Sequence, residues 1–366
     1  MAEAAEAAVV ATPAVAPVPV RAGDSVGIKA LGFSLHKRRY LAGFLAGHRL
    51  TFIDDPEHAQ PGDTVAVWAS SPLAEAVAAR AGVRVLRLED GFLRSVGLGA
   101  QLTQPLSWVV DETGIYFDAT RPSDLERMLQ AGVDDPALLE RARRLRERIV
   151  AAGISKYNVG ATHWSGLSDR RDRRRPVVLV AGQVERDASI RAGAIGGIAT
   201  NHDLIRAARA EHPDGWLVYK PHPDVVAGLR RAGAGEDDAA TLCDEIVVDA
   251  PMPRLLAAAD VVHVITSLTG FEALLRNRHV YCHGLPFYAG WGLTEDGVST
   301  PRRSRRLQLD ELVAAALLRY PRYVSRANGE PCSAEQALQE LIAWRQTDTG
   351  ALRWWHRLLR PMLRHD

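Results

Sequence analysis

The chain has 366 residues, more than one hydrophobic core normally organises, so we expect two domains. Its 45 basic and 44 acidic residues nearly cancel, which excludes the strong positive field of a nucleic-acid-binding protein. Three widely spaced cysteines argue against a structural zinc site and indicate a reducing compartment. No run of about 18 uncharged apolar residues occurs, so we expect a cytoplasmic protein without a membrane span.

The first half alternates strand-like and helix-like patterns. Residues 1–22, rich in Ala, Val and Pro, are expected to form a disordered leader rather than a signal peptide. Strands are predicted at 26–31, 64–68 and 83–88, followed by a strand pair at 106–111 and 114–117. Helices are predicted at 36–45, 72–81, 123–129 and 136–152.

A polar, basic link at 165–176 marks the predicted domain boundary, and the same rhythm restarts after it. Strands are predicted at 177–181, 216–219, 245–248 and 261–265, and helices at 202–211, 252–259 and 270–275. From residue 310 onward we expect helices and no further sheet. The predicted fold class is α/β, with doubly wound halves at 23–165 and 176–309 and a helical region at 310–366.

Two adjacent carboxylates, Glu89 and Asp90, directly follow the predicted strand 83–88 and precede Gly91. In open α/β sheets ligands bind beyond the carboxyl ends of strands, and a glycine lets backbone approach a ligand. Adjacent carboxylates repel, so one of the two is expected to keep its proton and act as an acid. The alternative is a solvated acidic turn.

Asp187 closes the stretch 182–187, directly after the predicted strand 177–181. A carboxylate held at the end of a rigid strand can attack a sugar as a nucleophile and form a covalent glycosyl intermediate. The alternative is an aspartate that only caps the following helix.

His222 lies between two prolines, just beyond the predicted strand 216–219. The prolines disfavour a helix at this position and hold the imidazole at the strand end. Together with Lys220, the histidine can donate hydrogen bonds to a phosphate. The alternative is an ordinary loop histidine.

The hydroxyl-rich stretch 266–272 follows the predicted strand 261–265 and precedes a helix. Hydroxyls and free amides at a helix N-terminus form a ready phosphate site, although simple N-capping is the alternative. The chain has neither a P-loop motif nor a GxGxxG motif after its first strand, which argues against an ATPase or a dehydrogenase.

Taken together, these stretches resemble the retaining β-Kdo transferases of bacterial capsule polysaccharide biosynthesis, a family whose longer members carry two such modules in tandem. The resemblance extends from about residue 32 to 323 and depends on several motifs rather than on one. The matching stretches are 89–100, 111–118, 183–187, 219–224, 266–275 and 286–294.

This resemblance implies a GT-B fold, in which two Rossmann-like domains face an interdomain cleft, with the acceptor on the N-terminal side. It also implies a CMP-Kdo donor, a Kdo-terminated or lipid-linked acceptor, no metal or other cofactor, and transfer with retention of configuration. Asp187 would be the nucleophile of a double displacement, and Glu89 or Asp90 the acid/base carboxylate. The donor-binding residues would be Gln183, Lys220, His222, Pro223, Thr266, Ser267, Thr269, Gly270 and Glu272, with Gly91, Arg94 and Arg186 in the matching loops.

The chain departs from the two-module members because it is long enough for only one module. We therefore expect it to add a single linkage, to work beside a separately encoded partner, or to make a shorter oligo-Kdo linker on a lipid. Its aromatic and basic tail at 354–360 either contacts the inner-membrane surface or packs back onto the first domain.

Other functions stay open, among them an epimerase acting on a nucleotide sugar, because a fold alone does not decide function. The chain could transfer another nonulosonic acid from its CMP donor, and only the pocket around the sugar would distinguish the two. It could instead be a non-catalytic capsule assembly or export module, working with capsule assembly proteins. The joint presence of Glu89, Asp90, Asp187 and His222 argues against a binder without turnover.

Overall fold

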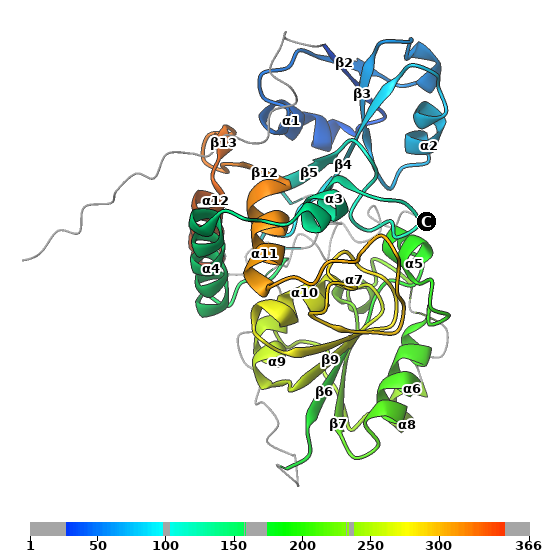
Figure 1. Ribbon diagram of the computed structural model, residues 1–366, viewed down its shortest axis with the longest axis vertical. Helices are drawn as coiled ribbons and strands as arrows, with labels where there is room; N and C mark the ends of the chain where they lie inside the picture. The colour runs from blue at the N-terminus through cyan, green and yellow to red at the C-terminus, as the bar shows by residue number, and fades with distance from the viewer. Residues whose placement is uncertain are drawn as a thin grey trace, which may run out of the picture.

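The chain builds two β-sheets, one above the other in Figure 1, with helices between and beside them. The computed structural model describes residues 27–97, 103–156, 158, 174–231, 233 and 238–347. The expected leader at 1–22 and the aromatic tail at 354–360 lie outside these residues. No helix within the described ranges is both long and apolar enough to cross a bilayer.

The first sheet has seven strands in the order β13-β12-β5-β4-β3-β1-β2. Its parallel part consists of β1 (Ile28–Leu31), β2 (Leu50–Ile53), β3 (Thr64–Trp68) and β4 (Arg84–Asp90). Its antiparallel part consists of β5 (Ser107–Asp111), β12 (Pro321–Val324) and β13 (Pro331–Cys332).

Helices cover both faces of this sheet because its strand residues alternate between two apolar clusters. On one face, α1 (Leu35–Phe44) packs through Phe44, whose ring stacks on Trp108 with 4.4 Å between ring centres. On the other face, α2 (Leu73–Ala78) and the short 3₁₀-helix η1 (Pro56–His58) lie together. The carboxyl ends of β1, β3 and β4 are left for loops.

The second sheet has six parallel strands in the order β11-β10-β9-β6-β7-β8. They are β6 (Val177–Ala181), β7 (Trp216–Lys220), β8 (Glu245–Ile246), β9 (Val261–Val264), β10 (His279–Cys282) and β11 (Glu295–Asp296). The helices of this half are α5 (Ala188–Gly193), α6 (Asn201–Glu211), α7 (Pro223–Val226), α8 (Ala239–Leu242), α9 (Met252–Ala258) and α10 (Leu268–Leu275). In this strand order, ligands bind where the order reverses, at the carboxyl ends of β6 and β9.

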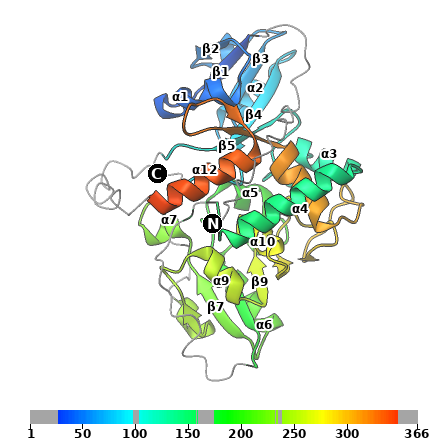
Figure 2. The ribbon, with the colours of Figure 1, turned by 90° about the vertical axis from the view of Figure 1, so that its left-hand side faces the viewer.

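A group of helices joins the two sheets. It comprises α3 (Asp124–Ala131), α4 (Pro136–Ala151), α11 (Leu309–Val313), the π-helix η4 (Ala314–Arg319) and α12 (Ala334–Thr347). α4 lies beside α11 and α12 (Figures 1 and 2). It is held there by ion pairs from Arg141 to Glu335, at 2.6 Å, and from Arg146 to Asp310, at 2.8 Å.

The two halves share one apolar core. Phe92, in the loop after β4, stacks on Phe287, which follows β10, with 4.7 Å between ring centres. Both rings also approach Phe271 of α10. Because this cluster includes residues of both sheets, burial of apolar surface stabilises the contact between the halves.

The α/β class with two sheets is confirmed, and β3 and β6 have the predicted bounds. Two expectations are wrong. Residues 114–117 form no strand, because the Asp111 carboxylate accepts N–H bonds from Thr113 and Gly114, at 2.9 and 2.7 Å, and turns the chain. The region after residue 310 is not purely helical, because β12 and β13 extend the first sheet beyond β5.

Candidate functional site

Gln183 and Thr266 stand at the reversal point of the second sheet, directly beyond β6 and β9. The Gln183 amide nitrogen donates to Thr266 Oγ1 at 3.0 Å, and the Thr266 backbone N–H donates back to Gln183 Oε1 at 2.8 Å. Asn201, at the start of α6, bonds both backbone groups of Gln183, each at 2.8 Å. All three residues are buried. Gln183 therefore acts as a clamp that holds two loops in place.

His222 caps α7, and this contact defines its tautomer. Its Nδ1 accepts the backbone N–H of Asp224 at 3.1 Å, so the ring proton of the neutral imidazole lies on Nε2. Burial lowers the pKa of His222. Pro223 occupies the first helical position, where a missing N–H costs nothing. The imidazole is thus a neutral donor with one N–H left for a ligand.

Asp187 lies on the same edge as His222. It is exposed, and among the described residues its carboxylate accepts a hydrogen bond only from Ser189 Oγ, at 2.7 Å. It does not cap α5 with its side chain, contrary to the capping alternative. Its negative charge acts on both His222 and Asp224. Asp187 is therefore an accessible carboxylate beside the imidazole.

Two basic residues, Lys220 and Arg186, precede His222 and Asp187 in the chain and differ in burial. Lys220 is buried at the end of β7, and its ammonium donates to the carbonyl of Val248. Burial lowers the pKa of Lys220. Arg186 is exposed beside Asp187, and its carbonyl accepts a hydrogen bond from Arg191 at 2.6 Å.

The stretch after β9 is organised mainly by its own contacts. Ser267 caps α10 by accepting the Thr269 backbone N–H at 3.2 Å, and the two hydroxyls are 3.1 Å apart. A Cβ on Gly270 would lie 2.3 Å from the hydroxyl of Tyr288, which itself donates to the Ser267 carbonyl. Glycine at 270 is therefore required by packing against Tyr288, and the capping alternative holds for Ser267.

Glu89 and Asp90 are the last two residues of β4 rather than part of a turn. Because side chains alternate along a strand, the two carboxylates point to opposite faces of the sheet. Asp90 forms an ion pair with the buried Arg94 at 2.6 Å. Glu89 accepts, among the described residues, only the Asp90 backbone N–H, at 3.1 Å. Burial, reinforced by the charge of Asp90, raises the pKa of Glu89 to about 7.

This contrast separates the two carboxylates chemically. A group with a pKa near 7 can both hold and release a proton under physiological conditions, which suits an acid/base catalyst. Asp90 is engaged by Arg94, which in turn donates to Ser95 at 2.8 Å. Gly91 serves packing, since a Cβ there would lie 2.3 Å from Ser107 Oγ.

Lys156, in the segment after α4, connects the two halves of the site and was not predicted. Its backbone N–H donates to Glu272 Oε1 at 2.7 Å, and its carbonyl accepts the Ser95 N–H at 3.3 Å. Its positive charge acts on Glu89, His222 and Glu272. Burial raises the pKa of Glu272. No spacing or motif marks this lysine, because its position depends on tertiary packing.

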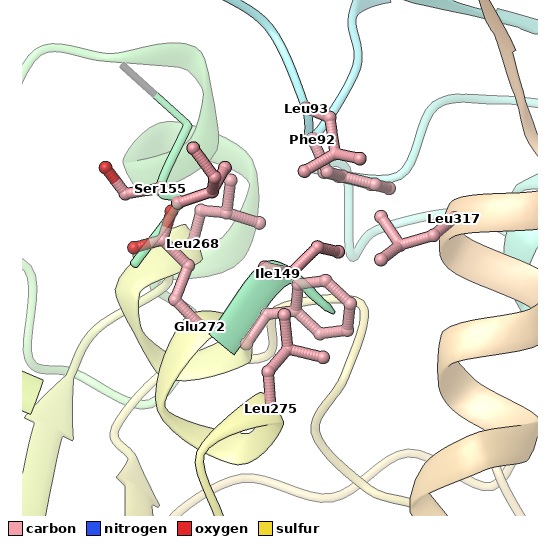
Figure 3. A pocket seen from close by; sticks show the side chains of 10 residues that line it. Phe92, Leu93, Ile149, Ser155, Leu268, Glu272, Leu275 and Leu317 are labelled. Atoms are coloured by element: carbon pink, nitrogen blue, oxygen red, sulfur yellow. The ribbon is translucent and has the colours of Figure 1, made fainter. Parts of the chain in front are cut away.

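A small pocket lies between side chains of both halves, and Glu272 is one of its lining residues (Figure 3). Phe92 and Leu93 line it from the first half, and Leu268 and Leu275 from α10. It has room for about one water molecule and is too small for a sugar. The described residues include no group of three or more His, Cys, Asp or Glu side chains placed to hold a metal ion.

Comparisons with known proteins identify the family of this chain. The family model of capsule polysaccharide biosynthesis proteins matches residues 66–324, which include every candidate residue from Glu89 to Glu272. The capsule polysaccharide modification protein LipA of Neisseria meningitidis serogroup A is 48% identical over 260 residues, 71% of this chain and 36% of LipA. The lipopolysaccharide-processing protein LpsZ of Rhizobium meliloti is 48% identical over 266 residues, 72% of this chain and 60% of LpsZ. The chain therefore spans between about a third and three fifths of these curated relatives.

Two solved structures share the fold at substantial identity. The β-Kdo 2,7 transferase of Thermosulfurimonas dismutans KpsC is 38% identical with a TM-score of 0.71, covering 87% of this chain and 99% of that one. The β-Kdo 2,4 transferase of the same KpsC is 33% identical with a TM-score of 0.75, over the same shares of the two chains. With the family match over residues 66–324, these relatives show that the chain belongs to the capsule polysaccharide biosynthesis protein family.

Proposed function

We propose that this chain is a retaining glycosyltransferase that moves β-Kdo from CMP-Kdo to a Kdo-terminated or lipid-linked acceptor during capsule polysaccharide synthesis. The proposal is supported by its similarity to two β-Kdo transferase structures and by its membership of the capsule family. It includes a GT-B arrangement, with the donor at the second sheet and the acceptor at the first.

The first step forms a covalent intermediate on Asp187. One carboxylate oxygen attacks the anomeric carbon of Kdo while the bond from that carbon to the phosphate oxygen breaks, and the electron pair leaves with CMP. CMP is already an anion, so it needs hydrogen-bond donors and positive charge more than a proton. His222 Nε2–H supplies the donor, and Lys156 supplies charge.

The second step transfers the sugar to the acceptor. Glu89, in its ionised form, takes the proton of an acceptor hydroxyl as that oxygen attacks the anomeric carbon. The bond to Asp187 breaks, and its carboxylate is regenerated. Two inversions at one carbon give net retention. With Asp90 engaged by Arg94, the structure favours Glu89 for this role.

One observation carries the proposal. Glu89 comes from the first sheet and His222 from the second, and the charge of Lys156 acts on both. The negative charge of Asp187 also acts on His222. Three groups from segments far apart in the sequence are thus brought into one region. They are an acid/base carboxylate, an N–H that can donate a hydrogen bond to a phosphate, and an accessible nucleophile.

The proposal requires no metal cofactor, because His222, Lys156 and Lys220 supply the donors and positive charge that a leaving phosphate needs. It places the reaction on the cytoplasmic side of the inner membrane, where a CMP-sugar and a glycolipid acceptor meet. Any contact with the membrane surface or with capsule assembly proteins belongs to the same proposal.

A transfer assay tests this function. CMP-Kdo is generated in situ and offered with a synthetic Kdo-terminated lipid acceptor to wild type, Asp187→Asn and His222→Ala. Wild type should form product, while Asp187→Asn should lose about 10³-fold or more and His222→Ala about 10²-fold. Asp214→Asn is the matched control, since this exposed carboxylate bonds no other described residue.

The other outcomes are informative. Undiminished product from Asp187→Asn would contradict double displacement. If only a different CMP-nonulosonic acid were turned over, the proposed site residues would stand and the proposed donor would change. Acceptor binding without turnover of any donor would favour a non-catalytic capsule assembly module.

A further inference from the structure

The first sheet has its own reversal point, which the donor side of the mechanism does not use. Its parallel strands lie in the order β4-β3-β1-β2, so the direction of winding changes between β1 and β3. Ligands of doubly wound sheets bind beyond the carboxyl ends of such a pair. This point lies next to Glu89 and Asp90, because β4 is paired with β3.

A lysine is held at this position. Lys37, in the first turn of α1, places its ammonium 3.1 Å from the centre of the Trp68 ring, and Trp68 is the last residue of β3. An ammonium over an indole face is attracted by the ring's quadrupole, which restrains an otherwise flexible side chain. The charge of Lys37 acts on both Glu89 and Asp90, so it faces the end of β4.

Two further basic side chains share this end of α1. His36 and Arg39 are three residues apart, so they lie on the same face of the helix. Positive charge from Arg39, Lys37 and Arg94 acts on the His36 ring. His36 therefore lies between Lys37 and Arg39 around the first turn of α1, within reach of the charge of Arg94.

The charges in this region are not balanced. Arg94 is paired with Asp90 at 2.6 Å, and the neighbouring Arg38 with Asp54 at 2.9 Å. Neither Lys37 nor Arg39 forms an ion pair with another described residue. Arg39 is exposed, whereas Lys37 is partly buried. Three cations, Lys37, Arg39 and Arg94, are matched by only two carboxylates, Glu89 and Asp90, so one positive charge is left for an anionic ligand to neutralise.

We propose that Lys37 and Arg39, with His36 between them and Arg94, bind an oxyanion of the acceptor and so hold the acceptor hydroxyl at Glu89. The oxyanion is a carboxylate of an acidic sugar or a phosphate of a lipid headgroup. This inference rests on the proposed function and deepens it by stating the chemistry of the acceptor. Side chains form this site, and the helix terminus does not contribute to it, because Ser34 already caps α1.

Equilibrium binding to the full chain, measured by calorimetry, tests the inference without turnover. The probes are the methyl β-glycoside of Kdo, its carboxamide, glycerol 3-phosphate and CMP. Wild type should bind the acid glycoside about tenfold more tightly than the carboxamide, because a charge-assisted contact is lost in the amide. Lys37→Met and Arg39→Gln should each remove most of this preference and leave CMP binding unchanged.

Three further variants separate the sites. Lys37→Arg should restore the preference, since it keeps the charge over Trp68. His222→Ala should weaken CMP only. Arg206→Gln, an exposed cation on α6, should change neither. Binding of glycerol 3-phosphate that also depends on Lys37 would identify the phosphate as a second source of the oxyanion.

Two results would overturn the inference: a wild type that does not prefer the acid glycoside, or a preference that survives both Lys37→Met and Arg39→Gln. A failure of the proposed function looks different. In that case CMP does not bind, or no Kdo is transferred, whatever the outcome with the glycosides.

Discussion

The two reversal points of this molecule are built from different chemistry. At β6 and β9, neutral groups are tied to one another: Gln183 bonds Thr266 in both directions, and His222 is oriented by the Asp224 N–H. At β1, β3 and β4, charged groups dominate, namely Lys37 over Trp68 and Asp90 paired with Arg94. The second sheet thus offers oriented hydrogen-bond donors beside the Asp187 carboxylate, whereas the first offers paired charges and a carboxyl that titrates near pH 7.

Among changes at the first sheet, Glu89→Gln should have the largest effect on turnover. The amide cannot take a proton from the acceptor, so we expect transfer to fall about 10²–10⁴-fold. Formation of the Asp187 adduct should persist, because CMP departure does not need Glu89. Rapid-quench measurement of CMP release should therefore show a burst of about one equivalent without acceptor product.

Asp90→Asn is the matched control for that prediction. It breaks the ion pair with Arg94 but leaves Glu89 in place. We expect a smaller loss of transfer than with Glu89→Gln. The opposite ranking would reverse our assignment of the acid/base.

Glu126→Gln should give the largest loss of stability. Its buried carboxylate bonds Arg302 at 2.7 Å and Arg303 at 2.8 Å, which joins α3 of the first half to the loop beyond β11. Neutralising it leaves Arg303 buried without its anion, at a cost of about 3–5 kcal/mol in the free energy of unfolding. Chemical denaturation followed by tryptophan fluorescence measures this cost. A loss under about 1 kcal/mol would show that the pair is not needed to hold the halves together.

Two glycines, one in each half, allow a test of close packing. Gly91→Ala would bring a Cβ within 2.3 Å of Ser107 Oγ, and Gly270→Ala would bring one within 2.3 Å of the Tyr288 hydroxyl. We expect each to lower the free energy of unfolding by about 1–3 kcal/mol, as overpacking does. Tyr288→Phe should partly relieve Gly270→Ala but not Gly91→Ala. Denaturation of the double variants checks this, and equal behaviour of both would contradict the packing account.

The smallest of the expected effects is a shift in the pH dependence of acceptor transfer when Lys37 is replaced. Glu89 must be ionised to act as a base, so the rate at saturating substrates should rise with pH through about 7. Lys37 favours the ionised form of Glu89, so Lys37→Met should raise the pKa of Glu89 and move the midpoint up by at most about one pH unit. Lys37→Arg should keep the wild-type midpoint. A midpoint that moves down would contradict the charge argument.

Local patterns predicted the strand ends at which the candidate site residues lie. Asp187 and His222 follow β6 and β7, whose apolar, β-branched runs are recognisable without tertiary information. β12 was missed because four residues starting with proline show little periodicity, and the strand is recognisable only by its pairing with β5. The strands β2 and β10 were also not predicted.

The internal order of the site was less accessible from the sequence. Glu89 and Asp90 are neighbours in the chain, but the sequence does not distinguish them. The structure does, because Asp90 is paired with Arg94 while burial raises the pKa of Glu89. Lys156 donates to Glu272, which lies 116 residues further along the chain. Such contacts depend on how two sheets meet, which no local pattern encodes.

The mass of the protein after incubation with the donor alone tests the central claim most directly. Glu89→Gln, incubated with CMP-Kdo without acceptor and analysed intact and after proteolysis, should carry one Kdo on the peptide that contains Asp187. The double variant with Asp187→Asn should carry none. An unmodified Asp187 peptide, found while CMP is released and product forms in the wild type, would contradict the account.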